Sequence, residues 1–178
     1  MATPIHESAW VVRAQCGDRE ALELLLRSAQ PGLHRFVSRV VGATDADDVV
    51  QNVLVTIARK LTWLAEPQLF RSWMFRIASR QAFAHLRRER RRAEGPLDEE
   101  IQAGMSAPVP PSDELLRELL DSDRLTPASR AVLVLHFQEE LPLAEVAAIL
   151  EIPLGTVKSR LASGLKSLRR HLSGTRSL

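Results

Sequence analysis

The sequence predicts an all-α protein built from two small helical domains joined by a flexible acidic linker. Three observations lead to this prediction. Apolar residues recur at helical spacing through most of the chain, no segment alternates polar and apolar residues as a strand does, and proline and glycine gather near the middle. We therefore expect an N-terminal helical bundle over residues 1–92, a linker over 93–111 and a C-terminal helix-turn-helix domain over 112–178.

The composition is that of a folded protein that does not enter a membrane. Of the 178 residues, 45% are hydrophobic, which is sufficient for packed cores. No apolar run approaches the ~18 residues that a membrane span needs, and residues 1–10 lack the basic and apolar regions of a signal peptide. The single cysteine, Cys16, allows no internal disulfide and suits a reducing compartment. We therefore expect a cytoplasmic protein without membrane insertion.

The distribution of charge predicts two surfaces that bind a polyanion. The formal net charge is only +2, but segment 71–92 contains eight arginines and one acid, and segment 156–178 contains six Lys/Arg and no acid. Between them, segment 93–123 contains nine acids and one arginine. A solvated helix face is the alternative interpretation of either basic segment alone; together they favour nucleic acid. The acidic segment is expected to mimic nucleic acid and to suppress DNA binding by the free protein.

The first half of the N-terminal domain is predicted to contain two helical segments. The first covers residues 7–28, with an interruption at Gly17 and Asp18, and the second covers 33–41. Pro31-Gly32 is expected to break the helix between them, and Gly42 is expected to end the second segment.

Two further helices complete the predicted bundle. Thr44 is expected to cap the next helix, with Asp45 and Asp47 in its first turn. A break over residues 62–68 then precedes a helix over 70–92, whose arginines lie mostly away from its apolar stripe.

The C-terminal domain is predicted to contain a helix-turn-helix. Thr126-Pro127 is a strong helix start, residues 143–150 form a short helix, and residues 151–153 form a tight break before a longer basic helix that starts near Leu154. Such a second helix fits the major groove of DNA, and residues in its first turns reach the base edges. An amphipathic helical hairpin is the alternative, but the charge asymmetry favours DNA. The apolar stripe of the long helix comprises Val157, Leu161, Leu165, Leu168 and Leu172.

The C-terminal residues resemble the fourth conserved region of extracytoplasmic-function (ECF) sigma factors. The resemblance lies in residues 125–130, 143–147 and 152–161, and the run Gly-Thr-Val-Lys-Ser-Arg-Leu at 155–161 is the most specific part. The resemblance implies that the last helix reads the minus-35 promoter element. Arg160 is suited to bidentate pairing with guanine, and Thr156 and Ser159 are suited to hydrogen bonds with phosphate or bases. Lys166, farther along the helix, is suited to contact with backbone phosphates. The residues expected to contact minus-35 DNA are Thr156, Lys158, Ser159, Arg160, Ser163 and Lys166.

Residues 45–51 resemble the helix of the second conserved region that docks on core RNA polymerase. The resemblance implies that Asp48 and Gln51 contact the polymerase, with Asp47 nearby, and carboxylates suit a basic partner surface. Helix capping is the plainer interpretation, and we expect it for Asp45.

Residues 70–78 and 86–88 resemble the helix that binds and opens the minus-10 element, and the family holds a flipped base in the loop over 62–68. Opening DNA requires cations for the separated strand and a stacking surface for the extruded base. A tryptophan at helical spacing is more often part of a core, and we favour that interpretation for Trp73. The residues expected to contact minus-10 DNA are Trp63, Trp73, Arg76, Arg80, Arg87 and Arg88.

The sequence also departs from the pattern that it resembles. Arg80 stands where the family usually has Asn, Ala84 where it has Asp, and Asn52 where Glu is common. These departures concern the details of promoter recognition rather than the overall assignment.

Two other classes of function compete with this interpretation, and a third, an interaction protein whose sigma-like surfaces are occupied by another protein, is compatible with it. An enzyme is disfavoured because the five histidines have no metal-ligand spacing and there is no glycine-rich phosphate loop, so we expect no catalytic residue, metal or cofactor. A stand-alone DNA-binding regulator would use the C-terminal domain but not the N-terminal half. The partners implied by the resemblance are bacterial core RNA polymerase, promoter DNA and an anti-sigma factor.

Overall fold

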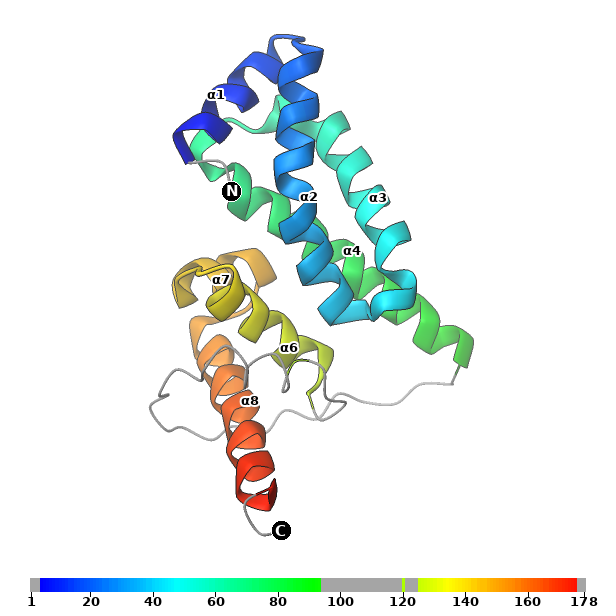
Figure 1. Ribbon diagram of the computed structural model, residues 1–178, viewed down its shortest axis with the longest axis vertical. Helices are drawn as coiled ribbons and strands as arrows, with labels where there is room; N and C mark the ends of the chain where they lie inside the picture. Colours follow the sequence, from blue (N-terminus) through cyan, green and yellow to red (C-terminus); the bar gives the residue numbers. More distant parts are fainter. Residues whose placement is uncertain (1–3, 94–119, 121–124, 176–178) are drawn as a thin grey trace. The chain divides into compact units, whose positions relative to one another are not determined.

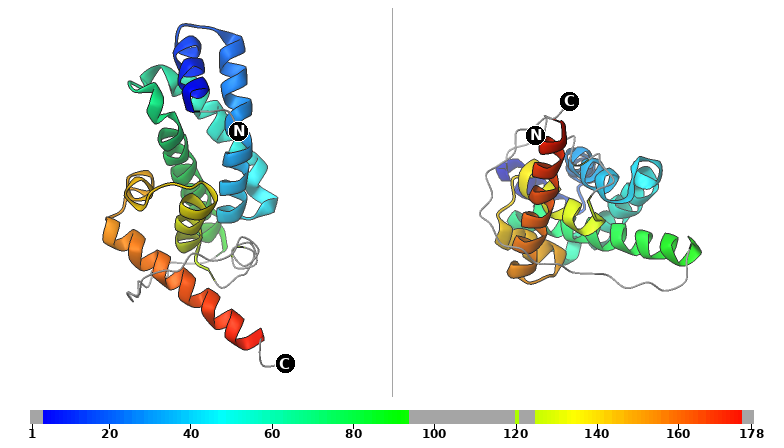
Figure 2. Two further views of the ribbon diagram at one scale, coloured as in Figure 1. Left: turned by 60° about the vertical axis from the view of Figure 1, so that its left-hand side comes forward. Right: turned by 90° about the horizontal axis from the view of Figure 1, so that it is seen from below.

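The computed structural model of the chain describes residues 4–93, 120 and 125–175. It divides into two compact units, Met1–Arg92 and Ala93–Leu178, whose helices are drawn in Figures 1 and 2. Every secondary-structure element among the described residues is helical, so the all-α prediction is confirmed. The predicted linker beyond Ala93 and the expected helix start at Ser112 lie outside the described residues.

The first unit packs four helices beside one another (Figure 1). Two short 3-10 turns, η1 (Leu61–Trp63) and η2 (Pro67–Leu69), join the third helix to the fourth, where the sequence predicted a break. The four helices are α1 (Pro4–Gln15), α2 (Arg19–Val41), α3 (Ala43–Lys60) and α4 (Phe70–Ala93).

The predicted interruption near Gly17 is confirmed as the turn between α1 and α2. Gly17 has a φ of +92°, which a residue without a Cβ adopts at little cost. The next residue, Asp18, caps α2 by accepting a hydrogen bond of 3.0 Å from the backbone N–H of Ala21. This bond lowers the pKa of the Asp18 carboxyl, with help from a hydrogen bond to Arg13.

The break predicted at Pro31-Gly32 is wrong, because both residues lie inside α2. A proline in a helix interior removes one hydrogen bond and costs roughly 3 kcal/mol. Pro31 is on the exposed side, however, while the buried stripe of α2 continues on both sides of it. Burial of each large apolar side chain contributes ~1.5–3 kcal/mol, so together they outweigh the proline. The stripe comprises Ala21, Leu25, Ala29, Leu33, Phe36, Val37 and Val40.

The predicted stop at Gly42 is confirmed, but the predicted cap at Thr44 is wrong. Gly42 has a φ of +99° and serves both as the C-cap of α2 and as the N-cap of α3. The third helix therefore begins at Ala43, which places Thr44 inside its first turn with no side-chain cap at its start.

The core of the first unit is centred on aromatic and branched side chains. Phe36 of α2 meets Phe75 of α4 edge to face, with ring centroids 5.7 Å apart and planes at 71°, an arrangement that aromatic rings favour. Val53 and Ile57 supply the buried face of α3. This core orients the remaining faces of α3 and α4 outward.

In the described part of the second unit, α6 (Pro127–Leu133) continues into a π-helical turn, η3 (Val134–Gln138). The predicted start is confirmed, since the Thr126 hydroxyl accepts a hydrogen bond of 3.2 Å from the Ser129 N–H and Pro127 follows at the first helical position. The short helix α7 (Leu143–Leu150) and the long helix α8 (Leu154–Thr175) complete the unit.

The turn between α7 and α8 lies where the sequence placed it. Glu151 adopts the left-handed conformation at φ +56°, and the Ile152 N–H donates to the Ala147 carbonyl at 3.1 Å. The predicted stripe of α8 is buried at Val157, Leu161 and Leu165. The side chains of Leu168 and Leu172, which were predicted to extend it, lie outside the described ones.

Gly164 allows α8 to approach α6 closely. A Cβ at this position would lie 2.9 Å from Leu133 Cδ1, and Leu133 is fully buried. The approach leaves no room for a side chain unless Leu133 moves within a packed core.

Gly164→Val is therefore expected to destabilise the second unit by about 1–3 kcal/mol through overpacking. Urea titration with hydrogen exchange of the α6 and α8 amides measures this change. Gly155→Val is the control, because nothing lies within 4 Å of a Cβ at Gly155. Equal losses for the two variants would contradict the packing argument.

Candidate functional site

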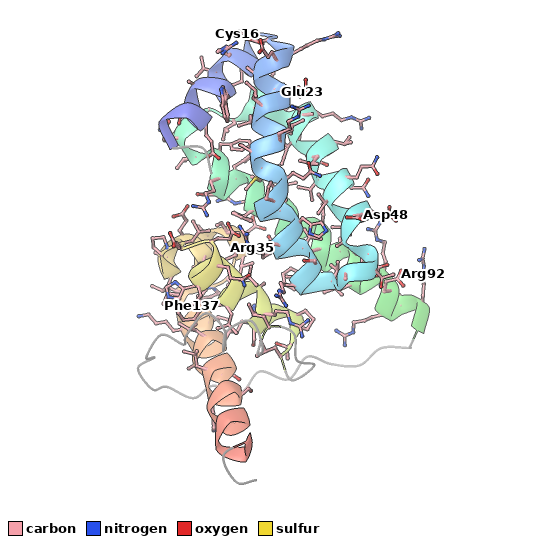
Figure 3. The ribbon with its side chains drawn as sticks, viewed as in Figure 1. Cys16, Glu23, Arg35, Asp48, Arg92 and Phe137 are labelled. Carbon is pink, nitrogen blue, oxygen red and sulfur yellow. The ribbon has the colours of Figure 1, made fainter. Side chains whose placement is uncertain are left out.

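The outer face of α3 carries the residues predicted to dock on polymerase. Asp47, Asp48 and Gln51 are all exposed there, at spacings that place them on neighbouring positions of one helix face. The Asp47 side chain is 89% exposed, and its Oδ1 lies 3.3 Å from Nε2 of His34. Figure 3 labels Asp48 on this helix. The surface is acidic and open to a partner.

Asp45 has a different role from its two acidic neighbours. Its Oδ2 lies 3.1 Å from Nε2 of His85, which comes from α4 and is 17% exposed. The carboxylate therefore ties the first turn of α3 to α4 and makes no side-chain cap.

A second polar contact joins the same two helices farther along. Nε2 of Gln81, one turn before His85 on α4, donates to the Thr56 hydroxyl at 2.8 Å. The two contacts hold α3 beside the arginine-rich half of α4. The position of each of these helices thus depends on the other.

The loop between α3 and α4 presents Trp63. The Trp63 side chain is 75% exposed, and the Lys60 ammonium lies 5.6 Å from its ring centroid, within range of a cation–π interaction. Gln15 of α1 holds the loop backbone, since its Nε2 lies 2.8 Å from the Leu61 carbonyl and 2.7 Å from the Leu64 carbonyl. An exposed indole on an anchored loop is a platform on which a base can stack.

Trp73 differs from Trp63. It is half-buried on α4, with its ring centroid 6.2 Å from that of the buried Phe70. Arg76, one turn along, is also half-buried, and its Nε has no hydrogen-bond partner among the described residues. Part of each side chain belongs to the packing of α4.

The other predicted DNA contacts of the first unit are exposed. Arg80, Arg87 and Arg88 face solvent along α4. The last two line a groove between α3 and α4. Six of the eight arginines of α4 are exposed, and the other two, Arg71 and Arg76, are half-buried.

The predicted minus-35 contacts share the first half of α8. Lys158, Ser163 and Lys166 are exposed, while Thr156, Ser159 and Arg160 are half-buried. The Ser159 hydroxyl donates to the Thr156 carbonyl at 3.0 Å. Because Val157 and Leu161 point into the core, the polar side chains between them are left on the outer faces of the helix.

Sequence reasoning missed the residues that position these surfaces. These residues contact others that lie 13 to 49 positions away in the chain, so no local sequence pattern predicts the contacts; they are Gln15, His34, Gln81 and His85. Among the described residues there is no group of three His, Cys, Asp or Glu that could hold a metal ion. No described helix is long and apolar enough to cross a membrane.

Comparison with known families assigns both units. The family model for sigma-70 region 2 matches residues 25–92, and the model for sigma-70 region 4 matches residues 123–170. The chain belongs to the sigma-70 family. It has regions 2 and 4. Two curated relatives, both named ECF RNA polymerase sigma-E factor, show that it is of the ECF type.

Curated relatives agree over almost the whole chain. An "ECF RNA polymerase sigma-E factor" of Haemophilus influenzae is 28% identical over 174 residues, covering 90% of this chain and 92% of the relative. The protein of the same name in Escherichia coli K12 is 29% identical over 174 residues, covering 90% and 91%.

Solved structures of similar proteins share the fold. CnrH, determined in complex with the cytosolic domain of CnrY, gives a TM-score of 0.65 at 22% identity, covering 95% of this chain and 98% of CnrH. The sigma factor RpoE, determined in complex with the anti-sigma factor NepR from Bartonella quintana, gives a TM-score of 0.66 at 19% identity, covering 85% and 96%.

The contact between His85 and Asp45 should contribute measurably to the stability of region 2. We expect His85→Ala to lower the free energy of unfolding by about 0.5–1.5 kcal/mol, the usual net value of one hydrogen bond. His34→Ala is the matched control and should change less, because the His34–Asp47 pair is far more exposed. Urea unfolding of both variants checks this order, and the reverse order would contradict it.

Proposed function

We propose that this chain is an RNA polymerase sigma factor that binds bacterial core polymerase and directs promoter-specific initiation. One observation carries the proposal: a single chain combines region 2, with an acidic face on α3 and an arginine-rich α4, and region 4, with a basic α8. A stand-alone regulator would need only the last of these. The polymerase supplies the chemistry, so the chain itself needs no catalytic residue.

Region 2, over residues 1–92, docks on the polymerase through α3. Asp47, Asp48 and Gln51 are exposed on one face and meet a basic partner surface. Complementary charge steers the approach and suppresses wrong partners. Asp48 is central to this contact because its carboxylate is exposed and has no ion pair among the described residues.

Region 2 also opens the minus-10 element. The exposed Trp63 stacks against the extruded base, an interaction worth about 1–3 kcal/mol per base. Arg76, Arg80, Arg87 and Arg88 neutralise the phosphates of the separated strand. Trp73, half-buried against Phe70, contributes at most its exposed edge to this surface.

Region 4, over residues 112–178, reads the minus-35 element as duplex. The first half of α8 enters the major groove, where Arg160 pairs with a guanine and Thr156 and Ser159 contact bases or phosphate. Lys158, Ser163 and Lys166 position the helix on the backbone. The segment over 93–111 joins the two regions.

We further propose that the chain works in the cytoplasm under the control of an anti-sigma factor. The sigma factor RpoE, which shares this fold, was crystallised with the anti-sigma factor NepR, and the structure of CnrH was determined in complex with the cytosolic domain of CnrY. A partner of this kind would act by masking the surfaces of α3, α4 or α8.

Two substitutions should separate the two surfaces. Arg160→Ala is expected to cost ~1–3 kcal/mol in duplex binding if Arg160 reads a base, and to leave polymerase binding intact. Asp48→Ala is expected to weaken polymerase binding and to leave duplex binding intact. Glu23→Ala is the matched control for the second variant, because Glu23 is an exposed acid of α2 whose ion-pair partner within the described residues is Arg27.

Polymerase binding is measured by fluorescence anisotropy with bacterial core enzyme, and duplex binding by the same method with promoter fragments. If Arg160→Ala and Asp48→Ala each lose both polymerase binding and duplex binding, the two surfaces are not separated and misfolding explains the result. If Asp48→Ala binds polymerase as well as Glu23→Ala does, α3 is not the docking helix.

A further inference from the structure

Helix α1 contacts the loop that presents Trp63, although none of the residues predicted to bind polymerase or DNA belongs to α1. It lies beside both short turns of that loop, η1 and η2 (Figure 1). The exposed indole of Trp63 is the surface on which the extruded base is proposed to stack. The contact with α1 therefore bears on how this surface is presented.

Two buried leucines flank the indole within the loop. Leu61 is 2% exposed and Leu64 is 8% exposed, whereas Thr62 and Trp63 between them are exposed. The Leu64 N–H donates to the Leu61 carbonyl at 3.0 Å, which closes a tight turn around the indole. Burial of the leucine side chains fixes where this turn attaches to the core. It does not by itself satisfy the carbonyl groups of the turn.

One side chain of α1 supplies donors to these carbonyl groups. Nε2 of Gln15 donates to the Leu61 carbonyl at 2.8 Å and to the Leu64 carbonyl at 2.7 Å. A primary amide carries two N–H groups, so a single Gln15 can bond both carbonyls at once. The amide thereby holds the backbone on both sides of Trp63.

Gln15 is itself held in place by its surroundings. Val11, one turn earlier on α1, is fully buried. Arg13 and Asp18 close the turn that contains Gln15, with Nη2 of Arg13 2.6 Å from Oδ2 of Asp18, and Asp18 also caps α2. The amide therefore extends from a fixed turn, as a group that positions another one must.

The ring of Trp63 is restrained as well as its backbone. Lys60 is the last residue of α3, and its ammonium lies over the indole, 5.6 Å from the ring centroid. This cation–π contact restrains the ring, while Gln15 restrains the backbone that carries it. Such preorganisation increases affinity, because a loop that is already ordered loses less conformational entropy when a ligand binds.

We propose that Gln15 is a positioning residue for base capture. By bonding the carbonyls of Leu61 and Leu64, it holds Trp63 in the orientation in which the extruded base stacks on the indole. Gln15 acts only through Trp63 and does not touch the base. The proposal deepens the proposed function and rests on it, since it assumes that region 2 holds a base at this loop. It gives α1 a role in opening the promoter.

The first measurement is hydrogen exchange of the loop amides in the full-length chain. Gln15→Met keeps the length and helix propensity of the side chain but has no donor. Gln15→Asn keeps the amide but is one methylene shorter, so it cannot bond both carbonyls. Both variants should exchange the Leu64 amide about 2- to 10-fold faster, as expected for the loss of one hydrogen bond. Gln30→Met is the matched control, because it makes the same change at an exposed position of α2, and it should leave the rate unchanged.

The second measurement is the affinity of the full-length chain for a fluorescent single-stranded DNA of random sequence, at about 50 mM salt. Trp63→Ala should weaken binding by roughly 5- to 150-fold, the loss of stacking on one base. Gln15→Met should weaken it by about 2- to 10-fold. The double variant with both changes should bind no more weakly than Trp63→Ala alone, because Gln15 acts through the indole. A role of Gln15 that is independent of the indole would make the two effects multiply.

Three results would overturn the proposal. They are unchanged exchange at Leu64 in both Gln15 variants, faster exchange with unchanged DNA affinity, and effects of Gln15→Met and Trp63→Ala that multiply in the double variant. A failure of the proposed function has a different signature: the unaltered chain does not bind the DNA, or Trp63→Ala binds it as well as the unaltered chain does. Either of these results removes the base from the loop, and the role of Gln15 with it. Thermal unfolding of every variant verifies that it is folded.

Discussion

The arrangement of this protein depends on the burial of one apolar stripe along each helix. In α2 the stripe runs unbroken past Pro31, and the gain from burial exceeds the cost of the proline. In α8 the buried Val157, Leu161 and Leu165 fix the rotation of the helix. Because successive residues are separated by about 100°, fixing the buried face also fixes which side chains face solvent. The charged surfaces are a consequence of the core.

Polar contacts then fix the positions of the Trp63 loop and of α3 relative to α4, which the apolar core alone does not determine. Gln15 holds the loop of Trp63 through two carbonyl groups, and Gln81 and His85 hold α3 against α4. The acidic half of α3 and the basic half of α4 are therefore held beside each other by side-chain contacts. In the proposed function this pair means that docking on the polymerase and contact with DNA depend on the same packing.

Local signals explain how much of this could be predicted from the sequence. Thr126-Pro127 and the turn at Glu151 follow from capping and turn chemistry that involves only neighbouring residues. The errors at Pro31 and Thr44 arose where such rules compete with tertiary packing or with an adjacent Gly42 that already ends one helix and begins the next. The apolar stripes were visible as periodicity, which is why the all-α fold was predicted correctly.

The groove between α3 and α4 was not predictable in this way. Arg59 and Arg91 are separated by 32 positions and share no motif, so it becomes known only when the two helices are packed that both line one groove. The same holds for His85 and Asp45. The residue types were visible in the sequence, but their juxtaposition was not.

The central claim is that these surfaces belong to one initiation factor. The most direct measurement is transcription in vitro from a fragmented genomic library by bacterial core RNA polymerase, with and without the chain. The account predicts discrete transcripts that appear only when the chain is present, with start sites that share one promoter motif. Absence of such transcripts together with absence of any binding between the chain and core polymerase would contradict it.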